Sequence, residues 1–149
     1  MPLQVMITTS GTRLLPENAV RIMCEELLPV TSLLTPNIPE ALLIVRESGN
    51  DFKDLESLDD FKVLAEAVAK LGPKNVLIKG GHCPLRKDHK VARSDNDKHI
   101  VANVLYSHGK FSVHEAAYQE SRNTHGTGCS LACTLPIPHC AMTYLMTLL

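Results

Sequence analysis

Apolar residues fall into short continuous runs and into helix-spaced sets, and polar or turn-forming residues separate the two kinds. The short runs predict buried strands at 3–8, 32–35 and 76–78. Apolar positions three or four residues apart predict three helices; these cover 16–28, 37–48 and 58–71. Because strands alternate with helices, the pattern indicates an α/β fold with a mainly parallel sheet.

Two of these helices begin with a capping signature. Asn37 is followed three residues later by Glu40, and Ser57 is followed at the same spacing by Asp60. In such a capping box each side chain accepts a hydrogen bond from the backbone N–H of the other residue. Gly72 is placed to end the helix that Ser57 begins.

A hairpin is predicted in the second half of the chain. Residues 100–106 and 111–114 have the composition of strands, and His108-Gly109 lies between them as a turn. The preceding segment, 83–99, is polar and charged, which predicts an exposed loop. Its histidines and cysteine do not match the spacing of a zinc site.

Composition limits the classes of function. The chain has 149 residues, 44% of them hydrophobic and 21% charged, which is typical of one globular domain spanning 1–149. A net charge of −1 and the absence of Trp argue against nucleic acid or an anionic membrane as partner. The sequence lacks an apolar run of roughly 20 residues that could cross a bilayer. Five cysteines without a disulfide spacing, and no signal peptide, predict a cytoplasmic protein.

The most informative stretch is Asn123-Thr124-His125-Gly126-Thr127-Gly128-Cys129-Ser130. A Gly-Thr-Gly turn at a helix start exposes backbone N–H groups beside the positive end of the helix dipole, which suits a phosphate. The same field would lower the pKa of a Cys129 thiol that faces the pocket. The alternative is an ordinary loop in which Cys129 is buried as a small apolar residue.

Two further stretches allow both a ligand-binding and a structural interpretation. Lys79 is followed by two glycines at the carboxyl end of a predicted strand, where α/β proteins usually bind ligands. The alternative is a glycine turn with an exposed lysine. Glu40 either completes the helix cap with Asn37 or faces a magnesium–phosphate cluster, through water.

Together and in this order, these segments resemble the hydroxymethylpyrimidine and hydroxymethylpyrimidine phosphate kinases of the ribokinase-like superfamily. The resemblance covers about 5–132, through the stretches 5–11, 34–41, 76–82 and 123–131. It implies a ribokinase-like three-layer α/β/α sandwich. It also implies transfer of the ATP γ-phosphoryl group to hydroxymethylpyrimidine or to its monophosphate, in thiamine biosynthesis.

The resemblance also implies roles for single residues. The turn formed by Gly126, Thr127, Gly128 and Cys129 would be the anion hole for the transferred phosphate. Cys129 would stand where most ribokinase-like sugar kinases have an aspartate base.

The remaining implied roles concern ATP and its magnesium ion. Lys79 and Thr9 would contact the nucleotide phosphates. Asn37 and Glu40 would organise Mg²⁺ and phosphate, with Glu40 acting through water.

The sequence departs from the family pattern in three places. Leu3-Gln4 replaces an Asp-Pro pair, the N-terminal half of the family has no counterpart, and residues 133–149 diverge where Pro136 interrupts a helix. We therefore expect a partial domain with an exposed sheet edge that could pair with a second copy. The same three departures predict weak or no kinase activity for this chain. Two alternatives stay open: a pyridoxal or pyridoxine kinase, and a catalytically inactive fragment.

Overall fold

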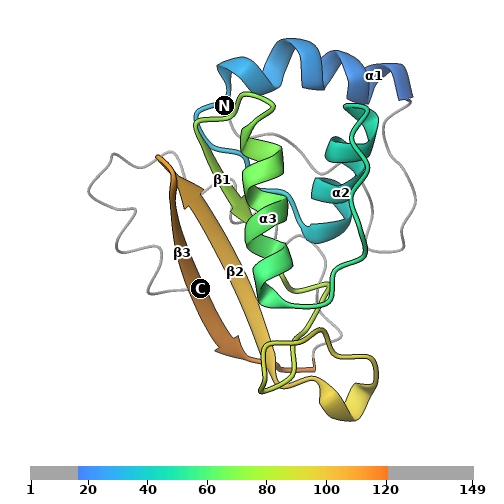
Figure 1. Cartoon of the computed structure of the whole chain (residues 1–149), viewed down its shortest axis with the longest axis vertical. Coiled ribbons are helices and arrows are strands. Elements are labelled where there is room, and N and C mark those ends of the chain that lie inside the picture. Colours follow the sequence, from blue (N-terminus) through green and yellow to red (C-terminus); the bar gives the residue numbers. More distant parts are fainter. Residues whose placement is uncertain (1–16, 121–149) are drawn as a thin grey trace.

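The computed structural model describes residues 17–120 (Figure 1). Its helices are α1 (Glu17–Ile22), α2 (Ile38–Glu47) and α3 (Leu58–Ala69), and its strands are β1 (Asn75–Ile78), β2 (Ile100–Ser107) and β3 (Lys110–Ala117). The strand predicted at 3–8 and the helix predicted after 128 lie outside the described residues.

The described strands form a sheet in the order β1-β2-β3 with antiparallel neighbours. The segment 31–37 lies along the other side of β1 in the parallel direction, through the bridges Leu34–Val76 and Asn37–Lys79. The predicted parallel pairing is therefore present on one side of β1 only. A two-residue turn joins β2 to β3 and permits only antiparallel pairing, and the connection from β1 to β2 contains no α-helix of the kind that usually crosses over to a parallel strand.

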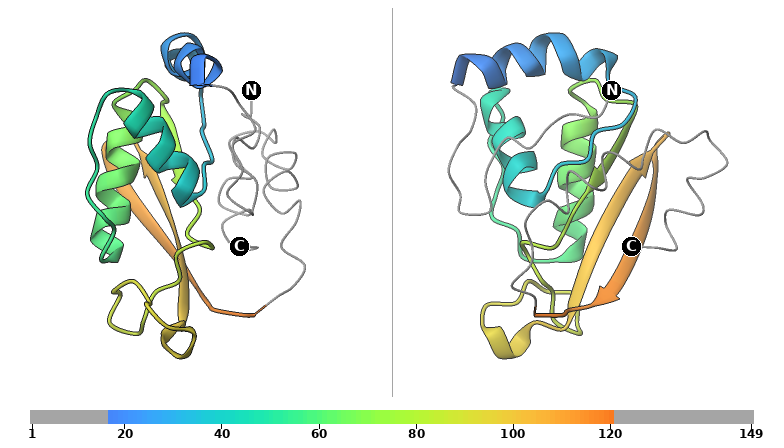
Figure 2. Two further views of the ribbon diagram at one scale, coloured as in Figure 1. Left: turned by 90° about the vertical axis from the view of Figure 1, so that its right-hand side faces the viewer. Right: turned by 180° about the vertical axis from the view of Figure 1, so that it is seen from behind.

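The helices α2 and α3 cover one face of this sheet (Figure 2). Phe61, Leu64 and Val68 are spaced along one side of α3, and all three are fully buried. They belong to the same core cluster as Val76 of β1 and Val104 of β2. This cluster joins the helix layer to the sheet layer, so the described residues form two layers of the predicted three-layer sandwich.

The predicted hairpin is confirmed. Ser107 pairs with Lys110, so the loop between β2 and β3 has two residues. These are His108 with φ 50° and Gly109 with φ 76°. Two positive φ values in succession are typical of the type I′ turn, whose twist matches that of the strands it joins.

The helix predicted for 16–28 changes its geometry along its length. After α1 come a π-helical turn, Met23–Leu27, and a 3-10 turn, Leu28–Val30, that contains Pro29. Pro29 also explains why residue 72 is a glycine: a Cβ at Gly72 would lie 2.6 Å from the Pro29 Cα, and the Gly72 φ is +128°.

None of the helices between residues 17 and 120 is long and apolar enough to cross a membrane.

The loop predicted at 83–99 is exposed but well anchored. Leu85 is fully buried, its N–H donates to the Ile100 carbonyl at 2.7 Å, and its carbonyl accepts from the Ile100 N–H at 2.9 Å. The Leu58 N–H, at the start of α3, donates to the His89 carbonyl at 2.9 Å. The loop is thus bound to β2 on one side and to α3 on the other.

Candidate functional site

Three of the predicted site residues meet at the carboxyl end of β1. Asn37 and Lys79 face each other in a parallel bridge, and the Lys79 N–H donates to the Pro36 carbonyl at 2.9 Å. Because α2 begins at Ile38, this bridge also fixes the N-terminus of that helix beside Lys79. Glu40 lies in the first turn of α2 and completes the group.

The predicted capping box of α2 is confirmed. The Glu40 N–H donates to Asn37 Oδ1 and the Asn37 N–H donates to Glu40 Oε2, each at 2.9 Å. Glu40 is buried, with 3% of its surface exposed. Oε2 of Glu40 is therefore engaged in the helix cap. Within residues 17–120, no three His, Cys, Asp or Glu side chains gather into a metal-binding group.

The two glycines after Lys79 have different surroundings. A Cβ at Gly80 would lie 2.0 Å from the Ala102 carbonyl oxygen, whereas a Cβ at Gly81 would meet nothing within 4 Å. In the ligand-binding interpretation of this stretch, both glycines would permit a ligand to approach the backbone closely. The structure assigns Gly80 to close packing against β2 and leaves open space only at Gly81.

Asn103 on β2 binds this turn and is not among the site residues predicted from the sequence. Its Oδ1 accepts a hydrogen bond from the Gly80 N–H at 3.1 Å. Asn103 lies within a predicted strand and belongs to none of the quoted motifs, so no local signal distinguished it from other strand residues.

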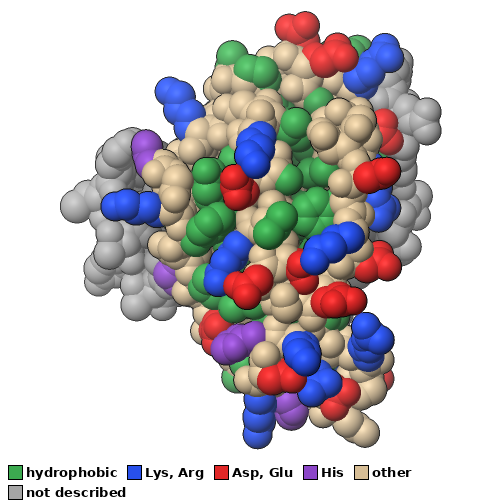
Figure 3. All heavy atoms as spheres, in the orientation of Figure 1, with side chains coloured by type: hydrophobic (Ala, Val, Ile, Leu, Met, Phe, Trp, Pro, Cys, Tyr) green, Lys and Arg blue, Asp and Glu red, His purple; other side chains and the backbone are tan. Residues whose placement is uncertain are grey.

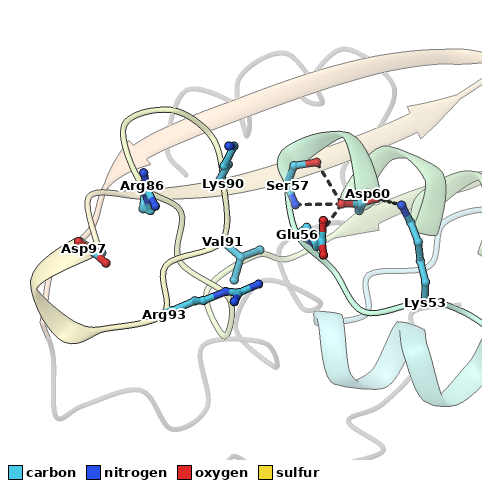
Figure 4. A pocket seen from close by; sticks show the side chains of 9 residues that line it. All are labelled: Lys53, Glu56, Ser57, Asp60, Arg86, Lys90, Val91, Arg93 and Asp97. Atoms are coloured by element: carbon cyan, nitrogen blue, oxygen red, sulfur yellow. Dashed lines mark hydrogen bonds and ion pairs between the residues drawn. The ribbon is translucent and has the colours of Figure 1, made fainter.

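A separate cleft of about 570 Å³ lies between the start of α3 and the loop 83–99 (Figure 4). Its lining consists of Lys53, Glu56, Ser57, Asp60, Arg86, Lys90, Val91, Arg93 and Asp97. Four of these side chains are cationic and three are carboxylates, so no single sign of charge dominates. The face of the molecule in Figure 3 likewise shows basic and acidic side chains interspersed.

Asp60 is the most strongly held group in this cleft. Its Oδ2 accepts hydrogen bonds from the Glu56 N–H, the Ser57 N–H and the Ser57 hydroxyl, and its Oδ1 pairs with Lys53 Nζ at 3.0 Å. Burial alone would raise the pKa of Asp60, but the hydrogen bonds from Lys53 and the backbone outweigh it and lower the pKa. These contacts confirm the capping signature of α3 and give Asp60 a structural role.

The remaining predicted site residues, Thr9, Gly126, Thr127, Gly128 and Cys129, lie outside the described residues. Two other cysteines are described, Cys24 and Cys83. Burial raises the pKa of both thiols. Both are therefore protonated at neutral pH and are poor nucleophiles.

The match to a known protein family extends over most of the chain. The sequence model of the family described as phosphomethylpyrimidine kinase matches residues 4–137. The chain belongs to the phosphomethylpyrimidine kinase family. The resemblance predicted from the four motifs is thereby confirmed, and the match includes all eight predicted site residues.

Curated relatives agree with this family. A putative hydroxymethylpyrimidine/phosphomethylpyrimidine kinase 2 of Schizosaccharomyces pombe is 40% identical over 128 residues, which are 86% of this chain and 23% of the relative. The hydroxymethylpyrimidine/phosphomethylpyrimidine kinase of Bacillus subtilis is 35% identical over 131 residues, 88% of this chain and 42% of the relative. The chain thus spans less than half the length of these kinases.

Solved structures support the predicted ribokinase-like α/β fold. The phosphomethylpyrimidine kinase of Clostridium difficile has a TM-score of 0.60 at 28% identity, covering 95% of this chain and 51% of that structure. The pyridoxal kinase of Staphylococcus aureus in complex with AMP-PCP has a TM-score of 0.64 at 23% identity, covering 96% and 44%. At that lower identity the second likeness concerns the fold alone.

Proposed function

We propose that this chain carries the phosphate-binding rim, formed by Asn37, Glu40 and Lys79, of a kinase of thiamine biosynthesis. The kinase transfers the ATP γ-phosphoryl group to hydroxymethylpyrimidine or its monophosphate. The observation that carries the proposal is the pairing of Asn37 with Lys79 at the carboxyl end of β1. Ligands of α/β proteins bind at such strand ends. In a chain of the phosphomethylpyrimidine kinase family, a lysine fixed at this position suits the nucleotide phosphates.

Lys79 would supply positive charge to the ATP phosphates. Asn37 would hold the Lys79 backbone in position through the bridge between the two residues. Glu40 would hold Mg²⁺ through a water molecule. Magnesium in kinases is usually held by one or two carboxylates together with substrate phosphates, and it keeps several waters. A single buried carboxylate in the first turn of α2 therefore suits this role, and Mg²⁺ would neutralise charge on the transferred group.

The remaining roles belong to residues outside 17–120. The backbone N–H groups of Gly126, Thr127 and Gly128 would donate hydrogen bonds to the phosphoryl group in the transition state of its transfer. Cys129 would accept the proton of the acceptor hydroxyl as its oxygen attacks phosphorus and ADP leaves. Thr9 would contact the nucleotide phosphates.

The test is acceptor-dependent ADP formation by the purified, folded chain with ATP and Mg²⁺. The acceptors are hydroxymethylpyrimidine, its monophosphate and pyridoxal. We expect at most weak turnover, and with the pyrimidines; Lys79→Ala should lower its kcat/KM by about 10- to 100-fold, the usual size of a lost charged hydrogen bond. Lys74→Ala is the matched control, because Lys74 is an exposed lysine just before the other end of β1.

Three outcomes would contradict the proposal. Turnover with pyridoxal alone would indicate a pyridoxal kinase. Equal effects of Lys79→Ala and Lys74→Ala would remove Lys79 from the site. A folded chain that neither binds ATP nor forms ADP would be a catalytically inactive fragment.

Self-association is a second part of the proposal. Within the described residues β3 pairs only with β2, so it forms one edge of this sheet. A second copy could pair along such an edge. Light scattering after size-exclusion chromatography would show a dimer, and a monomer at all concentrations tested would contradict the pairing.

A further inference from the structure

We propose that Asn103 is a positioning residue whose side chain fixes the turn 79–81 and thereby sets the affinity of the rim for nucleotide phosphates. The proposal rests on the function proposed above. It concerns a residue outside the motifs that predicted the site.

Asn103 lies where the pairing of β1 with β2 ends. The two strands pair in antiparallel register from Asn75–Ser107 to Ile78–Val104, and the ladder ends there. In a continued ladder Asn103 would lie opposite Lys79. Instead, the Asn103 side chain reaches the next residue and accepts the Gly80 N–H through Oδ1 at 3.1 Å. A side-chain acceptor thus replaces the backbone acceptor where the ladder stops.

Hydrogen bonds hold the turn 79–81 from both sides. The Lys79 N–H donates to the Pro36 carbonyl at 2.9 Å, and the following N–H, that of Gly80, donates to Asn103. The Gly80 carbonyl accepts from the Cys83 N–H at 2.8 Å. Asn103 is therefore the part of β2 that fixes the peptide directly after Lys79.

The peptide that joins Lys79 to Gly80 is packed tightly against β2. Gly80 is buried, and the Ala102 carbonyl lies where a Cβ of Gly80 would be. Water has little access to a buried N–H, so loss of the Asn103 acceptor would leave that donor without a partner. The turn would then shift to find one. A displaced turn lowers ligand affinity because binding must first restore its geometry.

The experiment compares Asn103→Ala with Asn103→Asp and with a matched control, Ser107→Ala. Asparagine to aspartate keeps an acceptor oxygen at the same position. Ser107 Oγ donates to Asn75 Oδ1 at 2.6 Å, so this control also removes a half-buried side-chain bond between β1 and β2, at the opposite end from Lys79. The probe for affinity is an ATP analogue carrying a fluorescent N-methylanthraniloyl group.

We expect Asn103→Ala to weaken binding of the analogue about tenfold, the effect of roughly one lost hydrogen bond, with Ser107→Ala within about threefold of the unaltered chain. Asn103→Asp adds a negative charge close to the phosphates, so this variant is compared by amide exchange and not by affinity. Amide hydrogen exchange gives a readout that does not need the ligand. Exchange at Gly80, divided by exchange at Leu77, should rise about tenfold in Asn103→Ala only, because global unfolding would speed both amides equally.

Unchanged affinity of Asn103→Ala, or an unchanged ratio of Gly80 to Leu77 exchange, would overturn the proposal. An equal loss of affinity in Ser107→Ala would also overturn it, since the effect would then come from stability alone. If the unaltered chain does not bind the analogue, the proposed function fails instead. The exchange ratio then still decides whether Asn103 holds the turn.

Discussion

Asn37 and Lys79 are paired in a parallel bridge, although Asn37 is the N-cap of helix α2 and Lys79 directly follows strand β1. The same Asn37 side chain accepts the Glu40 N–H at 2.9 Å. The cap of α2 and the backbone of the proposed phosphate-binding lysine therefore share one residue. A change that loosens the cap should also disturb Lys79.

Asn37→Ala should lower the free energy of unfolding by about 1 kcal/mol, as expected for loss of a helix cap. It should also weaken binding of the fluorescent ATP analogue, because the Lys79 backbone loses its fixed neighbour. Urea unfolding and fluorescence titration measure the two effects. Ser57→Ala, which alters the cap of α3, is the control and should lower stability without changing affinity. Equal affinities in both variants would separate the cap from the site.

Gly80→Ala should prevent normal folding or destabilise the chain by more than about 4 kcal/mol, the range of severe core clashes. The reason is the 2.0 Å distance from its Cβ to the Ala102 carbonyl, an atom of the backbone that cannot move aside. Gly81→Ala should be tolerated, because its Cβ meets nothing within 4 Å. Circular dichroism during urea unfolding compares the two. A stable Gly80→Ala variant would contradict the described packing of the turn.

Stability should fall in acid partly through Asp60. Its folded pKa is lower than the ordinary value of 3.8, so its contribution is complete above that value and is lost as the pH falls through the folded pKa. Asp60→Asn should therefore lower the free energy of unfolding at pH 7 by about 1–3 kcal/mol and flatten its decline below pH 4. The measurement is urea unfolding between pH 7 and pH 2.

Asp59→Asn is the control for this pH series. The Asp59 side chain is 84% exposed and pairs with Lys62 on the surface. Exposed pairs of this kind contribute about 0–1 kcal/mol, so the pH profile should change little. Identical profiles for the Asp59 and Asp60 variants would show that the capping network does not cause the acid sensitivity.

Leu85→Ala should destabilise the chain by about 2–5 kcal/mol, as for other fully buried leucines, and should release the loop 83–99. Leu85 is the fully buried residue that joins this loop to Ile100. Amide exchange at Val91 and Leu58 should speed up, because their N–H groups donate to the Glu56 and His89 carbonyls and so join the loop to the start of α3. Val63→Ala changes a side chain that is 51% exposed on α3 and should have a small effect. Unaltered loop exchange in Leu85→Ala would show that the loop is held elsewhere.

Structural features that depend on a few neighbouring residues were predicted correctly from the sequence. The capping pairs Asn37–Glu40 and Ser57–Asp60 and the turn at His108-Gly109 all formed as expected. Each depends on contacts within about four residues, which fix the backbone regardless of the rest of the chain. The motif around Lys79 likewise indicated the strand end at which Asn37 and Lys79 meet.

The sequence by itself determined the helix starts, the hairpin and the membership of a kinase family, because these follow from local patterns and motif order. Only the tertiary structure decided that β1 pairs antiparallel with β2, that Gly80 is required by Ala102, and that Asn103 holds the turn after Lys79. These features join residues more than twenty positions apart. Their geometry depends on which strand packs beside which, and the spacing of residues along the chain does not contain that information.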